Sequence, residues 1–198
     1  VNAKGGVHGQ PVELIALDDQ FDPKLAAENA RVLITEKRVV ALFLTRGTPH
    51  TQAILPLLAE HKVPLIAPST GAMLLHQPVN PWVFNVRATY QREAERAVQH
   101  LSLIGIERIA VIHVDDSFGA DAAQGAAKGF SAVGKQPLFV EKYKREKWDF
   151  AKIAVQVQDK NAQAVLFLGS GNAVADGIET LRAAGSKAQI VTLSNNAP

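Results

Sequence analysis

Hydrophobic residues along the chain fall into short runs that are rich in β-branched and aromatic side chains. Several of these runs, such as VALFL at 40–44 and AVLFL at 164–168, are apolar without alternation. Strands that are covered on both faces have this pattern, so the runs favour parallel sheets. Eight runs predict strands, at residues 13–19, 40–45, 64–68, 83–87, 108–114, 137–143, 164–169 and 189–194.

Longer stretches with helical spacing separate the runs, and many carry recognisable end signals. Asp22 followed by Pro23 predicts the start of a helix that extends to about residue 36. Further helices are expected at 48–61, 90–101, 117–133, 148–158 and 172–184, and glycines follow three of them, at positions 105, 134 and 185. The alternation of strands and helices predicts βαβ units and therefore an α/β fold.

The alternation breaks near residues 78–90, where NPWVFNVRATY begins a new series. We therefore expect two Rossmann-like lobes with parallel sheets, an N-terminal lobe at 1–86 and a C-terminal lobe at 87–198. Both are expected to be truncated. Residues 1–6 predict the last turn of a helix and its glycine cap, with the preceding strand missing, and residues 194–198 predict the loop that leaves a last strand.

The composition is that of a globular protein and limits the kinds of partner. Of the 198 residues, 47% are hydrophobic and 20% are charged, and the formal net charge of +2 is spread without a basic block, which argues against nucleic acid. The absence of cysteine excludes disulfides, zinc ribbons and thiol nucleophiles. No apolar run approaches the roughly 20 residues that span a bilayer.

Motifs of catalysis and cofactor binding are absent from the sequence. The six histidines show no HxxxH or HxH spacing and no evident partnership with a serine and an acid. GxGxxG after a strand and GxxxxGK[ST] do not occur, and Gly-Ser-Gly at 169–171 is only a fragment of such a loop. Capping and solvation explain the acid pairs at 18–19 and 115–116. We therefore expect no metal, no cofactor and no enzymatic activity.

Three loops that follow strands are candidates for binding a ligand, because open parallel sheets bind ligands at the carboxyl ends of their strands. The loop with Thr48 and the loop at 69–72 both combine small residues, hydroxyls and a helix start, which suits a carboxylate. In the loop at 115–119, Phe118 is suited to cover an apolar group. The alternatives are that Thr48 only caps its helix and that Phe118 packs within its own lobe.

The sequence also resembles a known family along essentially its whole length. VNAKGGVHGQPVELIALDDQFDPKLAAENARVLI, VALFLTRGTPHTQAILPLLAEHKVPLIAPSTGA, NPWVFNVRATYQREAERAVQHL and IAVIHVDDSFG follow the pattern of periplasmic solute-binding proteins of the branched-chain amino acid (leucine/isoleucine/valine) type. The resemblance implies the type I periplasmic binding fold, in which two lobes close on a small ligand, and an exported receptor whose partner is the membrane permease of an ABC importer. We expect a periplasmic location and a signal peptide that is not part of these 198 residues.

The resemblance also implies site residues. The loop with GTPHT supplies a hydroxyl to the ligand carboxylate, which falls on Thr48, and the loop with PSTGA supplies hydroxyls and backbone groups, which fall on Ser69, Thr70 and Gly71 and extend to Ala72. The aromatic residue that covers the ligand falls on Phe118.

Two departures from the family pattern concern the ligand's ammonium group. After the last strand, where amino-acid binders often carry an acid, this chain has Ser-Asn-Asn at 194–196, and Ser170 stands where an aromatic residue often follows the preceding strand. A buried ammonium without a carboxylate is costly. Either the ligand lacks an α-ammonium or the counter-charge comes from elsewhere. Ser170 and Asn195 complete the expected ligand-binding set.

The sequence thus predicts a receptor that binds an amino acid or a related small carboxylate between two lobes. A sensor domain of a regulator or receptor with the same fold is the alternative, and an enzyme ranks last. We also expect the incomplete lobes to expose apolar sheet edges that promote self-association.

Overall fold

The computed structural model describes residues 1–197, and its strands form two separate parallel sheets. The first sheet contains β1 (Leu42–Phe43), β2 (Leu65–Ile66) and β3 (Val83–Phe84), in that order. The second contains β4 (Ile109–Val114), β5 (Val140–Tyr143), β6 (Ala164–Leu168) and β7 (Gln189–Thr192), in the order β5-β4-β6-β7. All neighbouring strands are parallel, as predicted.

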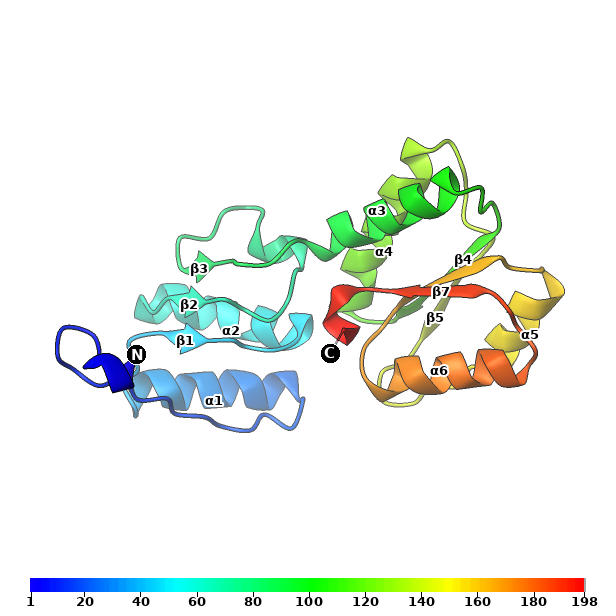
Figure 1. Ribbon diagram of the computed structural model, residues 1–198. Coiled ribbons are helices and arrows are strands. Elements are labelled where there is room, and N and C mark those ends of the chain that lie inside the picture. The colour runs from blue at the N-terminus through cyan, green and yellow to red at the C-terminus, as the bar shows by residue number, and fades with distance from the viewer. Residues whose placement is uncertain (198) are drawn as a thin grey trace.

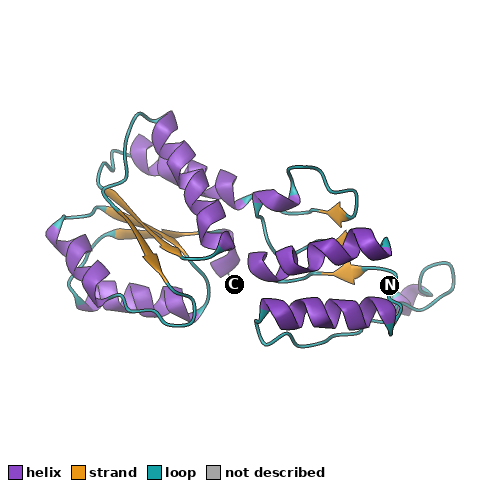
Figure 2. Ribbon diagram, turned by 180° about the vertical axis from the view of Figure 1, so that it is seen from behind, coloured by secondary structure: helices purple, strands orange, loops and turns teal. Residues whose placement is uncertain are grey.

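Helices connect the strands, which confirms the predicted α/β fold. The first lobe consists of the first sheet with α1 (Pro23–Thr35), α2 (Thr48–His61) and the 3₁₀ helices η1 (Asn2–Lys4) and η2 (Met73–Leu75). The second lobe consists of the second sheet with α3 (Tyr90–Leu103), α4 (Ser117–Ala132), α5 (Ala151–Asp159), α6 (Asn172–Ala183) and the 3₁₀ helix η3 (Ser194–Asn196). The lobes lie side by side, and the chain passes from one to the other between β3 and α3 (Figures 1 and 2).

Several helices begin or end where the sequence carries capping residues. The Asp22 side chain accepts hydrogen bonds from the N–H groups of Lys24 and Leu25 at the start of α1. Gly105 and Gly185, which follow α3 and α6, both have a φ of 83°, the left-handed conformation that favours glycine. Within residues 1–197, no helix is both long and apolar enough to cross a membrane.

Each lobe has its own buried apolar cluster. In the first lobe the cluster joins α1 and α2 to β1 and β2, and Trp82 packs against it. In the second lobe every residue of β4 and β6 is buried, as expected for strands covered by helices on both faces. Trp148 packs against this second, larger cluster. The lobes therefore have separate hydrophobic cores.

Helices α3 and α4 pack against each other through two glycines of α4. A Cβ atom on Gly125 would lie 2.2 Å from the carbonyl oxygen of Gln91, and one on Gly129 would lie 2.9 Å from Cβ of Val98. Because only glycine fits at such a distance, the small residues of α4 fix the separation of the two helices. Near the start of α4, Phe118 contacts Tyr90 of α3 across the same interface.

The sequence-based prediction of a strand at 13–19 is wrong. The segment belongs to no sheet, and its apolar residues Leu14 and Leu17 are 77% and 42% exposed. A strand requires a neighbour that accepts its hydrogen bonds, and β1 pairs with β2 alone among the described strands. The apolar run by itself therefore does not form a strand.

Smaller differences occur at the ends of elements. The strands β1, β2 and β3 are shorter than their apolar runs, and α5 begins at Ala151 instead of Trp148. Residues 194–196, expected to be an outgoing loop, form η3, and the Pro198 of that expected loop lies outside the described residues.

Candidate functional site

A cleft of about 660 Å³ lies between the two lobes. The strands of both sheets run toward the space between the lobes, so the loops at their carboxyl ends meet there (Figure 1). The residues that line the cleft are Phe21, Leu44, Arg46, Gly47, Thr48 and Ser69 from the first lobe, Arg87 from the connection, and Tyr90, Phe118, Tyr143, Arg145, Trp148, Ser170, Gly171, Asn172, Ala173 and Asn195 from the second lobe.

The loop between β1 and α2 presents Thr48 to the cleft. Gly47 precedes it with a φ of 89°, and a Cβ atom at this position would lie 2.5 Å from Nδ1 of His50, so glycine is required. Gly47, and not Thr48, is the N-cap residue of α2, and no side chain caps this helix start. The first-turn N–H groups of α2 therefore remain available for an anion.

Ser69 lines the same cleft from the loop after β2. Its N–H donates to the carbonyl oxygen of Thr45 at 2.7 Å, which holds this loop beside the loop after β1. The turns that carry Thr48 and Ser69 therefore face a shared cleft.

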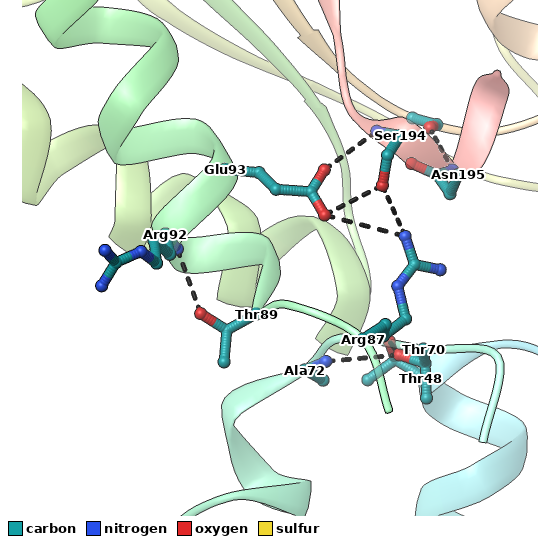
Figure 3. A network of polar contacts seen from close by, with 10 residues as sticks. Thr48, Thr70, Ala72, Arg87, Thr89, Arg92, Glu93, Ser194 and Asn195 are labelled. Atoms are coloured by element: carbon teal, nitrogen blue, oxygen red, sulfur yellow. Dashed lines mark hydrogen bonds and ion pairs between the residues drawn. The ribbon is translucent and has the colours of Figure 1, made fainter. Parts of the chain in front are cut away.

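The three residues that follow Ser69 lie behind this surface. Thr70 is buried, and its Oγ1 lies 2.7 Å from Oγ1 of Thr48 (Figure 3). The carbonyl oxygen of Gly71 accepts the N–H of Tyr90, and Ala72 is fully buried. The structure therefore places Thr70, Gly71 and Ala72 outside the lining of the cleft, where they support Thr48 and α3.

Five aromatic side chains line the cleft. Phe118 and Tyr90 pack edge to face with 4.9 Å between ring centroids, and both belong to the core of the second lobe. Phe118 thus packs within its own lobe, one of the two alternatives considered from the sequence, and its side chain also lines the cleft. Tyr143, Trp148 and Phe21 complete the aromatic part of the lining.

Two of the three arginines in the cleft are already paired. Arg145 binds Asp116 through Nη2 at 2.6 Å and donates to Oγ of Ser170 at 3.0 Å. Arg87 donates to Oγ of Ser194 at 2.6 Å and lies 3.7 Å from Oε1 of Glu93 (Figure 3). These ion pairs hold each guanidinium at the wall of the cleft.

Arg46 differs from the other two arginines. Its side chain is exposed and lines the cleft, and among residues 1–197 no hydrogen bond or ion pair reaches it. In the described part of the chain, the cleft therefore contains one free cationic group, and it lies in the same loop as Thr48.

The second lobe contributes polar groups opposite Thr48. Gly171, with a φ of 63°, precedes α6, whose start also has no side-chain cap. Nδ2 of Asn195 donates to the carbonyl oxygen of Gly169 at 3.1 Å, while Oδ1 of Asn195 is buried and accepts no hydrogen bond from the described residues. Ser170 and Asn195 both line the cleft.

Tyr143 contributes a neutral hydroxyl. Burial raises the pKa of Tyr143 to about 12, an effect that the nearby Arg145 guanidinium opposes and Asp116 reinforces. Its hydroxyl therefore stays protonated at physiological pH.

The sequence predictions placed Thr48, Ser69, Phe118, Ser170 and Asn195 in loops that the structure brings to one cleft. Sequence reasoning missed three arginines and several aromatic residues. Arg46 lies in the loop with Thr48 and could have been predicted, because an arginine two residues before a helix start is suited to bind an anion. The remaining missed residues come from distant segments and follow no motif: Phe21, Arg87, Tyr90, Tyr143, Arg145 and Trp148.

Groups suited to metal binding are absent from residues 1–197, where no cluster of three or more His, Cys, Asp or Glu side chains could hold an ion. The arrangement of hydroxyls, uncapped helix starts, guanidinium groups and aromatic rings is suited to non-covalent binding of an anion with an apolar body.

Known proteins are similar to this chain in sequence. The family model described as "periplasmic binding protein" matches residues 1–197. The Leu/Ile/Val-binding protein of Escherichia coli (strain K12) is 22% identical over 194 residues, which cover 96% of this chain and 52% of the relative. The "amino acid binding protein" of Pseudomonas aeruginosa is 22% identical over 171 residues and is covered over 46% of its length. The chain thus spans about half the length of these curated relatives.

Solved structures show the same similarity in three dimensions. A substrate-binding periplasmic protein from Ralstonia solanacearum matches with a TM-score of 0.91 and 28% identity, over 98% of this chain and 55% of that protein. A type 1 periplasmic binding protein from Bordetella pertussis matches with a TM-score of 0.85 and 21% identity, over 96% of this chain and 53% of that protein. These similarities confirm the fold expected from the sequence.

Proposed function

Because the chain belongs to the periplasmic binding protein family, we propose that it is a receptor domain that binds a small carboxylate between its two lobes. The observation that carries this proposal is that Thr48 and Ser69 line one cleft together with Arg46, which pairs with none of the described residues. Hydroxyl groups, uncapped N–H groups at a helix start and a guanidinium are all groups that bind carboxylates.

The ligand's carboxylate binds to the first lobe. Thr48 Oγ1 is held by Thr70, so its orientation is fixed before the ligand arrives. Ser69 and the start of α2 add hydrogen-bond donors, and Arg46 adds the charge. Preorganised groups lose little conformational entropy on binding, which favours affinity.

The second lobe closes over the rest of the ligand. Phe118 and Trp148 cover an apolar body, and Ser170 and Asn195 contact its polar atoms. Closure is favoured because the ligand contacts both lobes only in the closed state, so binding shifts the population toward that state. No covalent step is involved.

The cellular role that we propose is uptake. Two of the curated relatives are named as binding proteins for leucine, isoleucine and valine or for amino acids. By analogy, this domain acts in the periplasm and delivers its ligand to the membrane permease of an ABC importer. A closed, ligand-bound pair of lobes differs in shape from the open pair, which gives a permease a surface to recognise.

Isothermal titration calorimetry of the 198-residue chain tests the binding function. L-Leucine, L-isoleucine, L-valine and simple organic acids such as 4-methylpentanoate are the ligands to titrate. We expect at least one to bind with saturable heat, and Thr48→Ala combined with Ser69→Ala to weaken it at least tenfold.

The matched control combines Thr35→Ala with Ser131→Ala, at exposed positions that do not line the cleft. It should bind as the unmodified chain does. Absence of binding by every carboxylate, or equal binding by the two double variants, contradicts the proposal.

A further inference from the structure

We propose that the ligand is a carboxylate with an apolar body and no ammonium group, which is a narrower statement that rests on the proposed function. The charges around the cleft carry this inference. The cleft is lined by three arginines, and no aspartate or glutamate lines it among residues 1–197.

Three carboxylates behind the lining already accept hydrogen bonds, and one of them, Asp176, accepts Nε1–H of the lining residue Trp148 at 2.9 Å. Oδ1 of Asp116 accepts the N–H groups of Phe118 and Gly119, and its Oδ2 accepts Arg145. Glu93 accepts the N–H and the hydroxyl of Ser194. An ammonium group that bound one of these acids would compete with the hydrogen bonds that the acid already accepts.

Other acids near the cleft lie around a different cavity. Asp115 and Glu146 line a smaller cavity that shares only Phe21 and Arg145 with the cleft. Asp115 is also paired with Lys142 at 3.3 Å. These carboxylates therefore give no counter-charge to a ligand in the main cleft.

The balance of charge in the cleft is positive. Asp116 and Glu93 offset Arg145 and Arg87, and Arg46 is left without a partner in the described part of the chain. One ligand carboxylate neutralises this surplus. A zwitterionic amino acid would also bring an ammonium group into the same closed space. That ammonium would lose its hydration there without gaining a carboxylate of the lining as a partner.

The atoms around the rest of the ligand are neutral. The buried Oδ1 of Asn195 accepts no hydrogen bond from residues 1–197, and an amide oxygen can accept one from a hydroxyl as well as from an amine. The Tyr143 and Ser170 hydroxyls are neutral as well. Aromatic rings from Phe21, Tyr90, Phe118, Tyr143 and Trp148 supply an apolar surface for the body of the ligand.

The experiment compares ligands that differ only in the group at C2. Two skeletons are titrated by calorimetry in three forms each: L-leucine, 2-hydroxy-4-methylpentanoate and 4-methylpentanoate, and L-phenylalanine, 3-phenyllactate and 3-phenylpropanoate. We expect the hydroxy or unsubstituted acid to bind at least tenfold more tightly than the amino acid of the same skeleton.

Variants of Asn195 give a second readout that does not depend on absolute affinity. Asn195→Asp adds a carboxylate to the lining and should raise the affinity for the amino acid, relative to the hydroxy acid, at least tenfold. Asn196→Asp is the matched control, because Asn196 does not line the cleft. It should change the ratio of the affinity for the amino acid to the affinity for the hydroxy acid by no more than about twofold.

The outcomes separate this inference from the proposed function. If the amino acids bind as tightly as their hydroxy and unsubstituted analogues, the inference is wrong, and the proposed function of carboxylate binding is still supported. An unchanged ratio in Asn195→Asp also counts against the inference. If none of the six compounds binds to a chain that melts cooperatively, the proposed function fails and the inference fails with it.

Discussion

The side-chain oxygens of Thr48 and Thr70 lie 2.7 Å apart, although 22 residues separate them in the sequence. Both side chains are almost completely buried, with exposed fractions of 1%. One hydroxyl must donate and the other accept, so the pair fixes both rotamers and joins the loops after β1 and β2. The hydroxyl that we assign to the ligand is therefore held by a residue that the cleft does not contain.

We expect Thr70→Val to weaken both stability and ligand binding. The substitution keeps the shape but leaves the Thr48 hydroxyl without its partner, which costs roughly 1–3 kcal/mol for a buried polar group. Urea denaturation measures the stability change, and calorimetry measures the affinity. Thr70→Ser, which keeps the hydroxyl, should recover most of the affinity, and equal losses in both variants would argue against the hydrogen bond.

Gly125→Ala should destabilise the second lobe. The added Cβ would lie 2.2 Å from the carbonyl oxygen of Gln91, so α3 and α4 must separate. Overpacking costs about 1–3 kcal/mol, and the better helix propensity of alanine returns less than about 1 kcal/mol. Ser131→Ala, at an exposed position of α4, is the control for urea denaturation. A Gly125→Ala variant as stable as this control would show that the two helices can move apart freely.

The stability of the chain should fall between pH 10 and pH 12 in part because of Tyr143. Burial raises its pKa to about 12 in the folded state, whereas the ordinary value is 10. The unfolded chain thus releases this proton first, so the contribution to stability is complete below pH 10 and is lost as the pH rises through 12. That contribution is at most about 3 kcal/mol, because each pKa unit corresponds to about 1.4 kcal/mol.

Denaturation of Tyr143→Phe over the same range tests this linkage. The variant lacks the titrating hydroxyl and should lose less stability between pH 10 and pH 12 than the unmodified chain. Parallel curves for the two proteins would mean that the hydroxyl of Tyr143 ionises as readily in the folded state as in the unfolded state.

Self-association should occur through the sheet of the first lobe. Phe43 in β1 and Phe84 in β3 are 56% and 52% exposed, and both strands have a free edge among the described strands. Exposed apolar strand edges invite pairing between copies. Light scattering of the unmodified chain should report an average mass that rises with concentration. At the same concentrations, the variant that combines Phe43→Lys with Phe84→Lys should have a lower average mass. A monomer at high concentration contradicts this expectation.

Local signals in the sequence predicted a large part of the fold. Capping depends on neighbouring residues, so Asp22 marked the start of α1 and Gly185 followed the end of α6 as expected. The prediction of a strand at 13–19 was wrong because a strand also needs a neighbouring strand to pair with, which the apolar run itself does not supply.

The part of the candidate site that could be predicted is the meeting of loops that follow neighbouring strands. Thr48 and Ser69 follow adjacent parallel strands, and their meeting was expected from the α/β pattern. The charge balance was not predictable, because Arg145 and Asp116 are 29 residues apart and pair only in the folded chain. Sequence alone therefore could not separate Arg46 from the arginines that are already neutralised.

The distribution of the two tryptophans gives each half of the molecule its own spectroscopic reporter. Trp82 packs against the core of the first lobe and Trp148 against the core of the second, next to the cleft. Fluorescence of Trp82→Phe would therefore follow only the half that contains Trp148, and Trp148→Phe would follow only the other. Coincident melting curves would mean that the two cores unfold as one cooperative unit, and separated curves would mean that one half can remain native after the other has unfolded.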